Sequence, residues 1–303
     1  MSRPLGLAFL LAATLAPRIA EAGACCGEVS TLGDRLLSSE ALATSLGLAF
    51  KPRFGSFDAD GGFHGIPAGS TDVGASIFVD AVARVTQRLE VGASLDGSIN
   101  VRESGSVSAV GGGVGDVRAR ARVTIVDSAD TRYWPGFSAL VGAVVPTGVP
   151  ASRATDDLAV DVTGQGAGEV VVGVSADKLW EEIFFARVDA TAGFFVPESI
   201  GAERVLRAPR LTVTAALGPS FAWGSIGAGV SHEAEAAPLI ESAEPSEVGR
   251  SKTDLALFGW FPVNRRLAFV ARLRGPLPAD GFGAQETAEV SASLAVRLAL
   301  LEK

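Results

Sequence analysis

The sequence predicts an all-β protein: a single antiparallel transmembrane β-barrel of about 12 strands with a short N-terminal helix. Three observations lead to this fold class. Long stretches alternate between apolar and polar residues, and short and long connections between them alternate along the chain. The chain has 303 residues, of which 48% are hydrophobic, yet no uncharged apolar run long enough for a helical span follows the N-terminus. A barrel needs only every second residue to be apolar, so it reconciles these observations.

The clearest strand is predicted over Leu89–Arg102. Successive side chains of a strand point to opposite faces, so one face here is wholly apolar and the other is polar or charged. Strands of soluble proteins are commonly five or six residues long, and this alternation runs about twice as far. A tilted membrane-spanning strand needs roughly 9–11 residues. The stretch therefore favours a membrane barrel over a soluble sandwich.

The same pattern predicts eleven further strands. Strong alternation marks Val117–Ile125, Phe184–Val196 and a last strand over Ala288–Leu298. Weaker alternation marks Leu46–Phe54, Val73–Val85, Phe137–Val145, Val170–Ala176, Leu211–Trp223, Ile226–Ala234, Leu255–Phe261 and Leu267–Leu273.

The connections support closure into a barrel. Short turns are predicted at Thr86-Gln87-Arg88, around Leu179 and Trp180, at Trp223-Gly224-Ser225 and at Val263-Asn264-Arg265-Arg266. Longer loops are predicted over Gly55–Thr71, Glu103–Gly115, Thr147–Gly168, Pro197–Ala208, Ala236–Ser251 and Pro276–Glu286. Transmembrane barrels have short periplasmic turns and longer outer loops, and an even strand number places both termini on the periplasmic side. The tryptophans Trp134, Trp180, Trp223 and Trp260 lie near the short turns, where barrels carry interfacial aromatics.

The N-terminus predicts an export signal. Arg3 precedes the apolar stretch Leu5–Ala16, and small residues allow cleavage after Ala22 or Ala24. Residues 1–24 are therefore predicted to be a signal peptide that is removed on export.

The next segment is predicted to be periplasmic and to precede the barrel. It covers residues 25–44 and includes a short amphipathic helix over Leu32–Ala43, and the barrel follows over residues 45–303. The only cysteines are Cys25 and Cys26, which are adjacent and so predict no disulfide framework. Lipidation at Cys25 is an alternative to simple cleavage, because Ala22-Gly23-Ala24-Cys25 resembles a lipoprotein box.

Three glycine-rich motifs point to a family. Gly113-Val114-Gly115-Asp116-Val117, Val145-Pro146-Thr147-Gly148 and Thr163-Gly164-Gln165-Gly166 resemble segments of outer-membrane proteins of the phenol meta-degradation type. The resemblance covers roughly Gly111–Val174, and it implies a barrel that transports small hydrophobic compounds. One departure concerns the end of the chain. Such barrels usually end on an aromatic residue that the barrel assembly machinery recognises, whereas this chain ends Leu300-Leu301-Glu302-Lys303.

The charged residues on the inward faces are the candidate functional residues. Arg118, Arg120 and Arg122 are spaced by two and are predicted to form a ladder on one wall of the lumen. The other lumen-lining candidates are Arg84, Arg102, Arg187, Asp80, Asp96, Asp189 and Glu90, together with further charges such as Lys51, Arg53, Asp72, Asp177, Asp254, Arg272, Arg274 and Glu289. A basic stripe would favour anionic or polarisable solutes. Alternatively, the charges pair across strands and fill the interior.

The favoured function is that of an outer-membrane porin or transporter for small molecules, hydrophobic or anionic. The alternative is a non-conducting structural or adhesion barrel with a charge-filled interior; a soluble secreted protein is less consistent with the alternation. An enzyme is not predicted, because His232 has Ser231 and Glu233 as sequence neighbours, and neighbours in a strand face opposite sides. The partners expected are outer-membrane lipid, a small solute and the barrel assembly machinery, and the oligomeric state is open.

Composition excludes other classes of partner. A net charge of −8 without a basic run argues against nucleic acid. No cofactor is predicted, since the glycine-rich stretches are not followed by a Lys-Ser or Lys-Thr pair and open no helix. Asp58-Ala59-Asp60-Gly61-Gly62 begins like a calcium loop but lacks the later ligands, so a plain surface turn and no metal are predicted.

Overall fold

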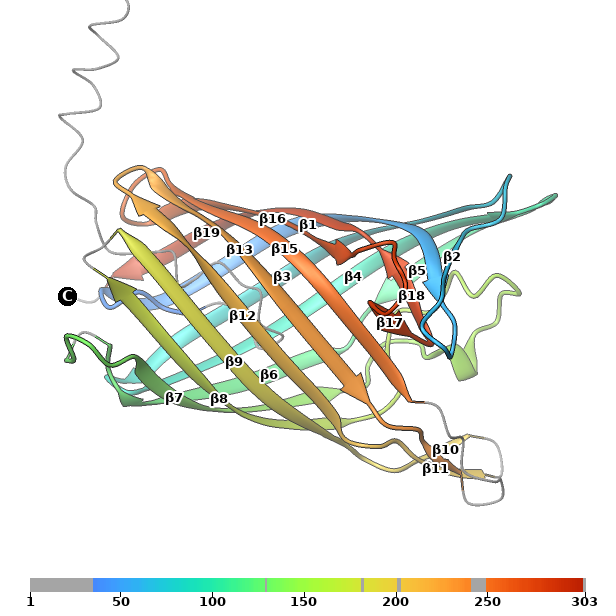
Figure 1. The fold of residues 1–303 in the computed structure, drawn as a ribbon, viewed down its shortest axis with the longest axis horizontal. Coiled ribbons are helices and arrows are strands. Elements are labelled where there is room, and N and C mark those ends of the chain that lie inside the picture. Colours follow the sequence, from blue (N-terminus) through green and yellow to red (C-terminus); the bar gives the residue numbers. More distant parts are fainter. Residues whose placement is uncertain (1–34, 129, 181–182, 201–202, 241–248, 302–303) are drawn as a thin grey trace, which may run out of the picture.

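The computed structural model describes residues 35–128, 130–180, 183–200, 203–240 and 249–301. The strands close into one antiparallel barrel, in which each barrel strand pairs with the next along the chain (Figure 1). The ring is closed by β1 and β19, whose pairing runs from Glu40↔Leu301 to Phe50↔Ala292. The twelve barrel strands are β1 (Glu40–Phe57), β3 (Thr71–Thr86), β4 (Leu89–Ser104), β6 (Val117–Val126), β7 (Gly136–Val145), β8 (Glu169–Trp180), β9 (Phe184–Phe195), β12 (Arg210–Phe221), β13 (Gly224–Glu235), β15 (Arg250–Pro262), β16 (Leu267–Pro276) and β19 (Ser291–Leu301). The predicted twelve-stranded barrel is confirmed.

Shorter elements lie at the end of the barrel with the long connections. The chain that the structure describes starts and ends at the opposite end, where the turns are short (Figure 1). Four short strands extend the barrel sheet and three form a separate small sheet. They are β2 (Phe63–Gly65), β5 (Val107–Val114), β17 (Gly283–Ala284) and β18 (Glu286–Glu289), and then β10 (Glu198–Ile200), β11 (Glu203–Leu206) and β14 (Leu239–Ile240); a 3₁₀ turn, η2, covers Ala151–Arg153.

The strand β5 is an element that the sequence analysis assigned to a loop. It continues β6 along the same edge of β4, with a break at Gly115 and Asp116. The pairing shifts by one residue across the break, from Ser94↔Arg118 to Gly97↔Val114. The β4–β5 hairpin therefore projects beyond the rest of the barrel (Figure 1).

The predicted helix over Leu32–Ala43 is wrong in the part that the structure describes. Residues 32–34 lie outside the described residues, residues 35–39 are not helical, and Glu40–Ala43 already belong to β1. Helix-like spacing of leucines is overridden here because β1 gains strand partners on both sides, β3 and β19. No helix in the described part of the chain is long and apolar enough to cross a membrane. The predicted signal peptide and Cys25 lie outside the described residues.

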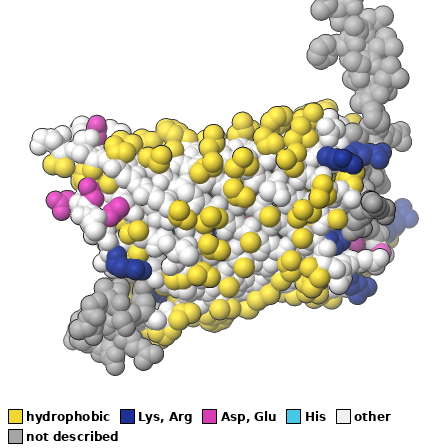
Figure 2. All heavy atoms as spheres, turned by 180° about the vertical axis from the view of Figure 1, so that it is seen from behind, with side chains coloured by type: hydrophobic (Ala, Val, Ile, Leu, Met, Phe, Trp, Pro, Cys, Tyr) yellow, Lys and Arg dark blue, Asp and Glu magenta, His cyan; other side chains and the backbone are white. Residues whose placement is uncertain are grey.

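The barrel exterior carries the apolar face of each strand. In β4, for example, Leu95 is 41% exposed and Ile99 is 60% exposed, whereas the intervening polar residues point inward. Hydrophobic side chains spread over the middle of the surface and charged ones gather toward its two ends (Figure 2). An exterior of this kind is that of a transmembrane barrel, because lipid replaces water around it.

The two faces of β4 provide a test of this register. Leu95→Arg is expected to destabilise the membrane-inserted barrel by about 2–4 kcal/mol, because it places a charge against lipid. The neighbouring Ser94→Arg is the matched control, and a smaller cost is expected because Ser94 borders internal cavities. Urea unfolding of both variants in lipid vesicles measures the difference, and equal costs would contradict the register.

The aromatic residues divide between the two faces. Trp223 stacks between Phe221 and Phe261, at centroid distances of 4.9 and 6.2 Å, beside a short turn. Trp260 differs from the prediction: it is 6% exposed and packs inward against Val270. It has the same strand phase as the inward residues of β15, so its side chain cannot reach the lipid interface.

Candidate functional site

The arginine ladder of β6 is neutralised by carboxylates from other strands. Arg118 donates to Asp96 at 3.0 Å, and Arg120 makes two hydrogen bonds to Asp80, at 2.6 and 2.7 Å. These acids belong to β4 and β3. Arg122 turns the other way, toward β8, and donates to Asp177 at 3.2 Å and to Ser175 at 3.3 Å.

The remaining lumen-lining candidates also lie in polar networks. Arg187 and Asp189 pair along β9 at 2.9 Å. Arg84 lies 3.6 Å from Glu90 and donates to the backbone at the short-turn end. Arg102 donates to Asp72 at 3.2 Å and to backbone carbonyls of a long loop.

The sequence analysis left two interpretations of the arginine ladder: a basic stripe that attracts anions, or charges that pair across strands. The observed ion pairs favour the second. A guanidinium held by a carboxylate contributes little net field to a passing ion, so β6 does not present three free positive charges. Arg118 is the most accessible of the three, with 48% of its side chain exposed, against 11% for Arg120 and 9% for Arg122. The pairing across strands therefore describes the ladder better than a basic stripe does.

The interior still contains space. One cavity of about 320 Å³ lies between the wall β1–β3–β4 and the wall β15–β16–β19. A second, of about 260 Å³, lies between β6–β7 and β8–β9–β12. Ser94 and Arg118 border both cavities, so the two cavities lie next to each other on either side of the Arg118 side chain. Cavities of this order accept small molecules or their parts.

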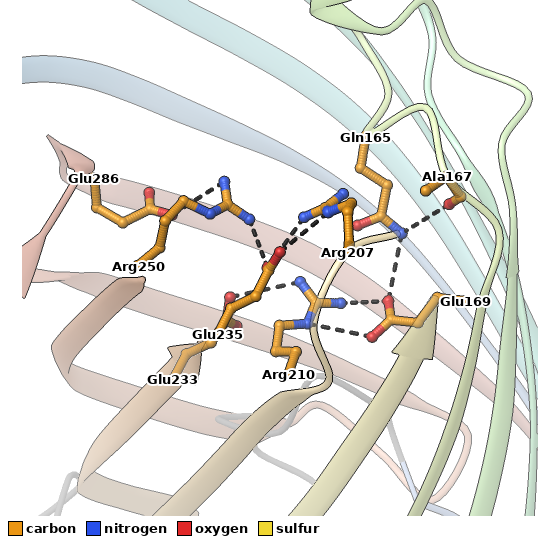
Figure 3. Close-up of polar contacts among 9 residues, drawn as sticks. All are labelled: Gln165, Ala167, Glu169, Arg207, Arg210, Glu233, Glu235, Arg250 and Glu286. Atoms are coloured by element: carbon orange, nitrogen blue, oxygen red, sulfur yellow. Dashed lines mark hydrogen bonds and ion pairs between the residues drawn. The ribbon is translucent and has the colours of Figure 1, made fainter. Parts of the chain in front are cut away.

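A second ionic network lies at the long-loop end, and the sequence analysis missed it (Figure 3). Glu235 accepts from Arg207 at 3.1 Å and from Arg250 at 2.7 Å. Arg210 makes an ion pair with Glu169. The sequence analysis ended the strand before Glu235 and placed Arg207 in a loop, so the inward alternation of these residues was hidden. These pairs bring the ends of β8, β12, β13 and β15 together.

The three motifs of the family resemblance meet around one buried carboxylate. Asp116 is 3% exposed, and it accepts hydrogen bonds from the backbone N–H of Gly148 at 3.0 Å and of Gln165 at 2.8 Å. The approach requires glycine, because a Cβ on Gly164 would lie 2.5 Å from Asp116 Oδ1. Nothing in the linear sequence indicated that these motifs, up to 49 residues apart, lie in contact.

Asp116 thereby fixes residues 146–168, which we call the lumen loop, over the interior. Asn100 donates to Val160 O at 2.9 Å, and Arg102 donates to Leu158 O at 2.6 Å. Val160 is 2% exposed and packs where a side chain on Gly111 would otherwise lie. The inward residues of β4 and β5 therefore hold the loop against the barrel wall.

Within the lumen loop, Asp161 accepts from the backbone N–H and the hydroxyl of Thr155, both at 2.8 Å. These hydrogen bonds hold the pKa of Asp161 below its ordinary value. A lowered folded-state pKa means that the contact is present at neutral pH and is lost as the pH falls through that lowered pKa.

The short-turn end is covered by residues 35–39, which we call the mouth segment. Arg35 donates to Asp177 at 2.7 Å, reaching from the segment to β8. Arg84 donates to Leu37 O at 2.7 Å, and Arg297 donates to Arg35 O at 3.1 Å. The segment is thus bound to β3, β8 and β19, and it lies across this end of the barrel.

The two histidines lie on exposed surfaces and contact a hydroxyl and a carboxylate. His232 Nδ1 lies 2.9 Å from Thr253 Oγ1 on an exposed surface, whereas Ser231 faces inward and pairs with Thr214. His64 lies 2.7 Å from Asp58 in an exposed loop. This places His232 and Ser231 on opposite faces of β13, as the strand pattern predicts.

The segment around Asp58 is a hydrogen-bonded turn. Asp58 Oδ1 accepts from the N–H groups of Asp60 and Gly62, at 3.0 and 2.7 Å. The hydrogen bond with His64 lowers the pKa of Asp58. No group of three histidine, cysteine, aspartate or glutamate side chains is arranged for a metal ion in the described part of the chain.

The comparisons with known proteins concern the fold. No family model and no curated protein matches the sequence. The structure resembles the COG4313 outer membrane channel from Pseudomonas putida F1, with a TM-score of 0.70 and 15% identity over 90% of this chain and 100% of that chain. It also resembles the beta domain of the Bordetella autotransporter Brka, with a TM-score of 0.51 and 10% identity over 86% of this chain and 100% of that one. At these identities the resemblance shows a shared barrel fold.

Proposed function

We propose that the protein is an outer-membrane channel that passes small molecules through its lumen. The carrying observation is the pair of adjacent cavities, both bordered by Arg118, inside a closed barrel with an apolar exterior. The COG4313 channel, whose fold this chain resembles, is itself an outer membrane channel. In this proposal the short-turn end faces the periplasm, both termini lie there, and residues 1–24 are an export signal.

The solutes proposed are small, hydrophobic or anionic. Twelve strands give a bore between that of an eight-stranded barrel, which side chains fill, and that of an open porin of sixteen strands or more. Ion pairs occupy part of this bore, and the cavities are small. Large polar solutes are therefore outside the proposed range.

A non-conducting barrel is the second candidate, and specific contacts favour it. The lumen loop covers one end, the mouth segment covers the other, and the charges between them are largely paired. In that case the barrel would serve as a structural or adhesion element, anchored in outer-membrane lipid after insertion by the barrel assembly machinery.

Measurements on the purified full-length protein distinguish the two candidates. If the channel proposal is right, proteoliposomes in isotonic solutions of small neutral solutes swell faster than protein-free liposomes, and planar bilayers show discrete conductance steps. Slow swelling together with a silent bilayer, for protein that retains the heat-modifiable migration of a folded barrel, would support the non-conducting candidate.

A further inference from the structure

We infer that Arg118 is a movable gate between the two cavities of the lumen. This inference rests on the proposed function, because it names the side chain that controls passage through the same interior. Three observations carry it: the position of Arg118 between the cavities, the single ion pair that holds it, and the firmer fixation of the other two arginines of the ladder.

The position of Arg118 makes its side chain the partition. Of the residues that the structure describes, Arg118 and Ser94 alone border both cavities. These two residues pair across β6 and β4, and Ser94 has only a short side chain. The long side chain between the cavities is therefore that of Arg118. If it moves aside, the volumes of about 320 and 260 Å³ join into one.

A single ion pair holds this side chain. Arg118 Nη1 donates to Asp96 at 3.0 Å, and the guanidinium makes no other hydrogen bond or ion pair with the described residues. The Arg118 side chain is half-exposed, and an exposed ion pair with one hydrogen bond restrains a long side chain weakly, because water competes for both charges. We therefore expect Arg118 to leave Asp96 and return by rotation about its own bonds.

Asp96 is the fixed part of this contact. The Gly115 N–H donates to the backbone carbonyl of Asp96 at 2.7 Å, at the break between β5 and β6. The carboxylate lies against the same glycine, where a Cβ would be 2.8 Å from Oδ2. The acceptor thus keeps its place on β4 when the arginine moves, so the side chain can return to it and close the gate.

The other two arginines of the ladder are held more firmly. Arg120 donates to both carboxylate oxygens of Asp80, and its guanidinium covers Gly92, where a Cβ would lie 3.0 Å from Cζ. Arg122 is buried and donates to two side chains of β8. A bidentate contact or burial fixes the geometry of a guanidinium. Among the arginines of β6, Arg118 alone has contacts that allow this movement.

Asp96 is also the favoured partner of Arg118 within the lumen. Two other acids border the cavities, Asp80 in the larger and Glu169 in the smaller, and both accept from other arginines. A side chain that leaves Asp96 therefore finds no free carboxylate among the residues that border these cavities. The closed position is thus the resting one, and a solute crosses from one cavity to the other only while Arg118 is displaced.

The mobility of the side chain tests the inference without requiring passage. In the full-length protein in detergent micelles, nuclear magnetic relaxation gives an order parameter for each arginine Nε–Hε group. For Arg118 a value below about 0.6, as for a flexible group, is expected, and for Arg120 a higher value. Arg118→Lys and Arg120→Lys identify the two signals by their disappearance. Equal order parameters for the two groups would overturn the inference.

Conductance measures the effect of removing the partition. Arg118→Cys shortens the side chain, and it is expected to raise the single-channel conductance in planar bilayers severalfold. Reaction of this cysteine with a bulky cationic methanethiosulfonate then places a long, positively charged side chain at the same position. The conductance is expected to fall back toward the wild-type value, so one variant reports both the open and the closed lumen.

Two controls isolate the position. Val123→Cys carries its cysteine on the outer face of the same strand, borders neither cavity, and is expected to conduct like the wild type before and after the reaction. The wild-type protein treated with the reagent accounts for Cys25 and Cys26. In a barrel that conducts, an unchanged conductance in Arg118→Cys, or a raised one that the reagent does not lower, would contradict the gate.

The two proposals fail separately. Equal passage of small solutes by the wild type and by Arg118→Cys would support the channel and reject the gate. Conductance that appears only in Arg118→Cys, together with a mobile Arg118 in the wild type, would support both and locate the closure at this side chain. Folded protein that is silent in both forms would reject the channel, and the gate would then stand or fall with the mobility of Arg118.

Discussion

Asp177→Ala is expected to lower the free energy of unfolding of the barrel by about 3–5 kcal/mol. Asp177 is 2% exposed and accepts from both Arg35 and Arg122. Arg35 lies near the end of the barrel and its side chain can turn toward water when the carboxylate is lost. Arg122 is buried, so it would remain as a positive charge without its carboxylate in a site of low polarity. Urea unfolding in lipid vesicles, followed by tryptophan fluorescence, measures the effect.

Two further variants separate the buried pair from a general loss of charge. Asp177→Leu combined with Arg122→Leu removes both charges and is expected to recover most of the lost stability, because no buried ion is left unpaired. Asp130→Ala removes an exposed aspartate from a turn at the same end and is expected to change little. If the double variant is as unstable as Asp177→Ala, the uncompensated charge is not the cause.

Asp116→Leu is expected to release the lumen loop from the barrel wall. The substitution removes the acceptor of the Gly148 and Gln165 N–H groups, and hydrogen bonds to a charged group are worth about 1.5–3 kcal/mol each. A loss of about 3 kcal/mol raises the open population on the order of a hundredfold. Trypsin cleavage after Arg153, which is exposed in this loop, should accelerate accordingly.

The effect should be specific to the buried carboxylate. Asp157→Leu alters an exposed aspartate in the same loop, and cleavage after Arg153 is expected to stay at the wild-type rate. In planar bilayers, Asp116→Leu should also raise the conductance, because the loop no longer covers the interior. An unchanged cleavage rate in a correctly folded Asp116→Leu barrel would show that other contacts hold the loop.

The strands could be predicted because their signal is local. The alternation in Leu89–Arg102 follows directly from lipid on one side and a polar lumen on the other, and β4 starts at the predicted residue. Strand ends were less accurate. The turn expected around Leu179 and Trp180 lies after β8, because both residues still pair with β9. Local alternation of apolar and polar residues does not indicate at which residue strand pairing ends and the turn begins.

The candidate site depended on contacts that are distant in sequence. The inward charges could be identified by their strand phase, but their partners could not. Arg122 pairs with an acid 55 residues away on β8, whereas its neighbour Arg120 pairs with one 40 residues away on β3. The partners of Asp116 could not be predicted either, because it accepts hydrogen bonds from two glycine-rich segments that are distant from it in sequence. The strand β5 was not predicted for a similar reason. It forms by pairing with β4 beyond the break at Gly115, and this pairing leaves no signal in the local sequence.

The mouth segment has a consequence for the order in which the molecule folds. Its contacts come from β3, β8 and β19, so the surface that binds it does not exist until the last strand has joined the first. Docking of Arg35 is therefore a late event that reports a completed ring. A thiol pair introduced at Leu36 and Val82, which share one buried cluster, would be oxidised after the protein becomes resistant to protease during refolding, and earlier oxidation would contradict this order.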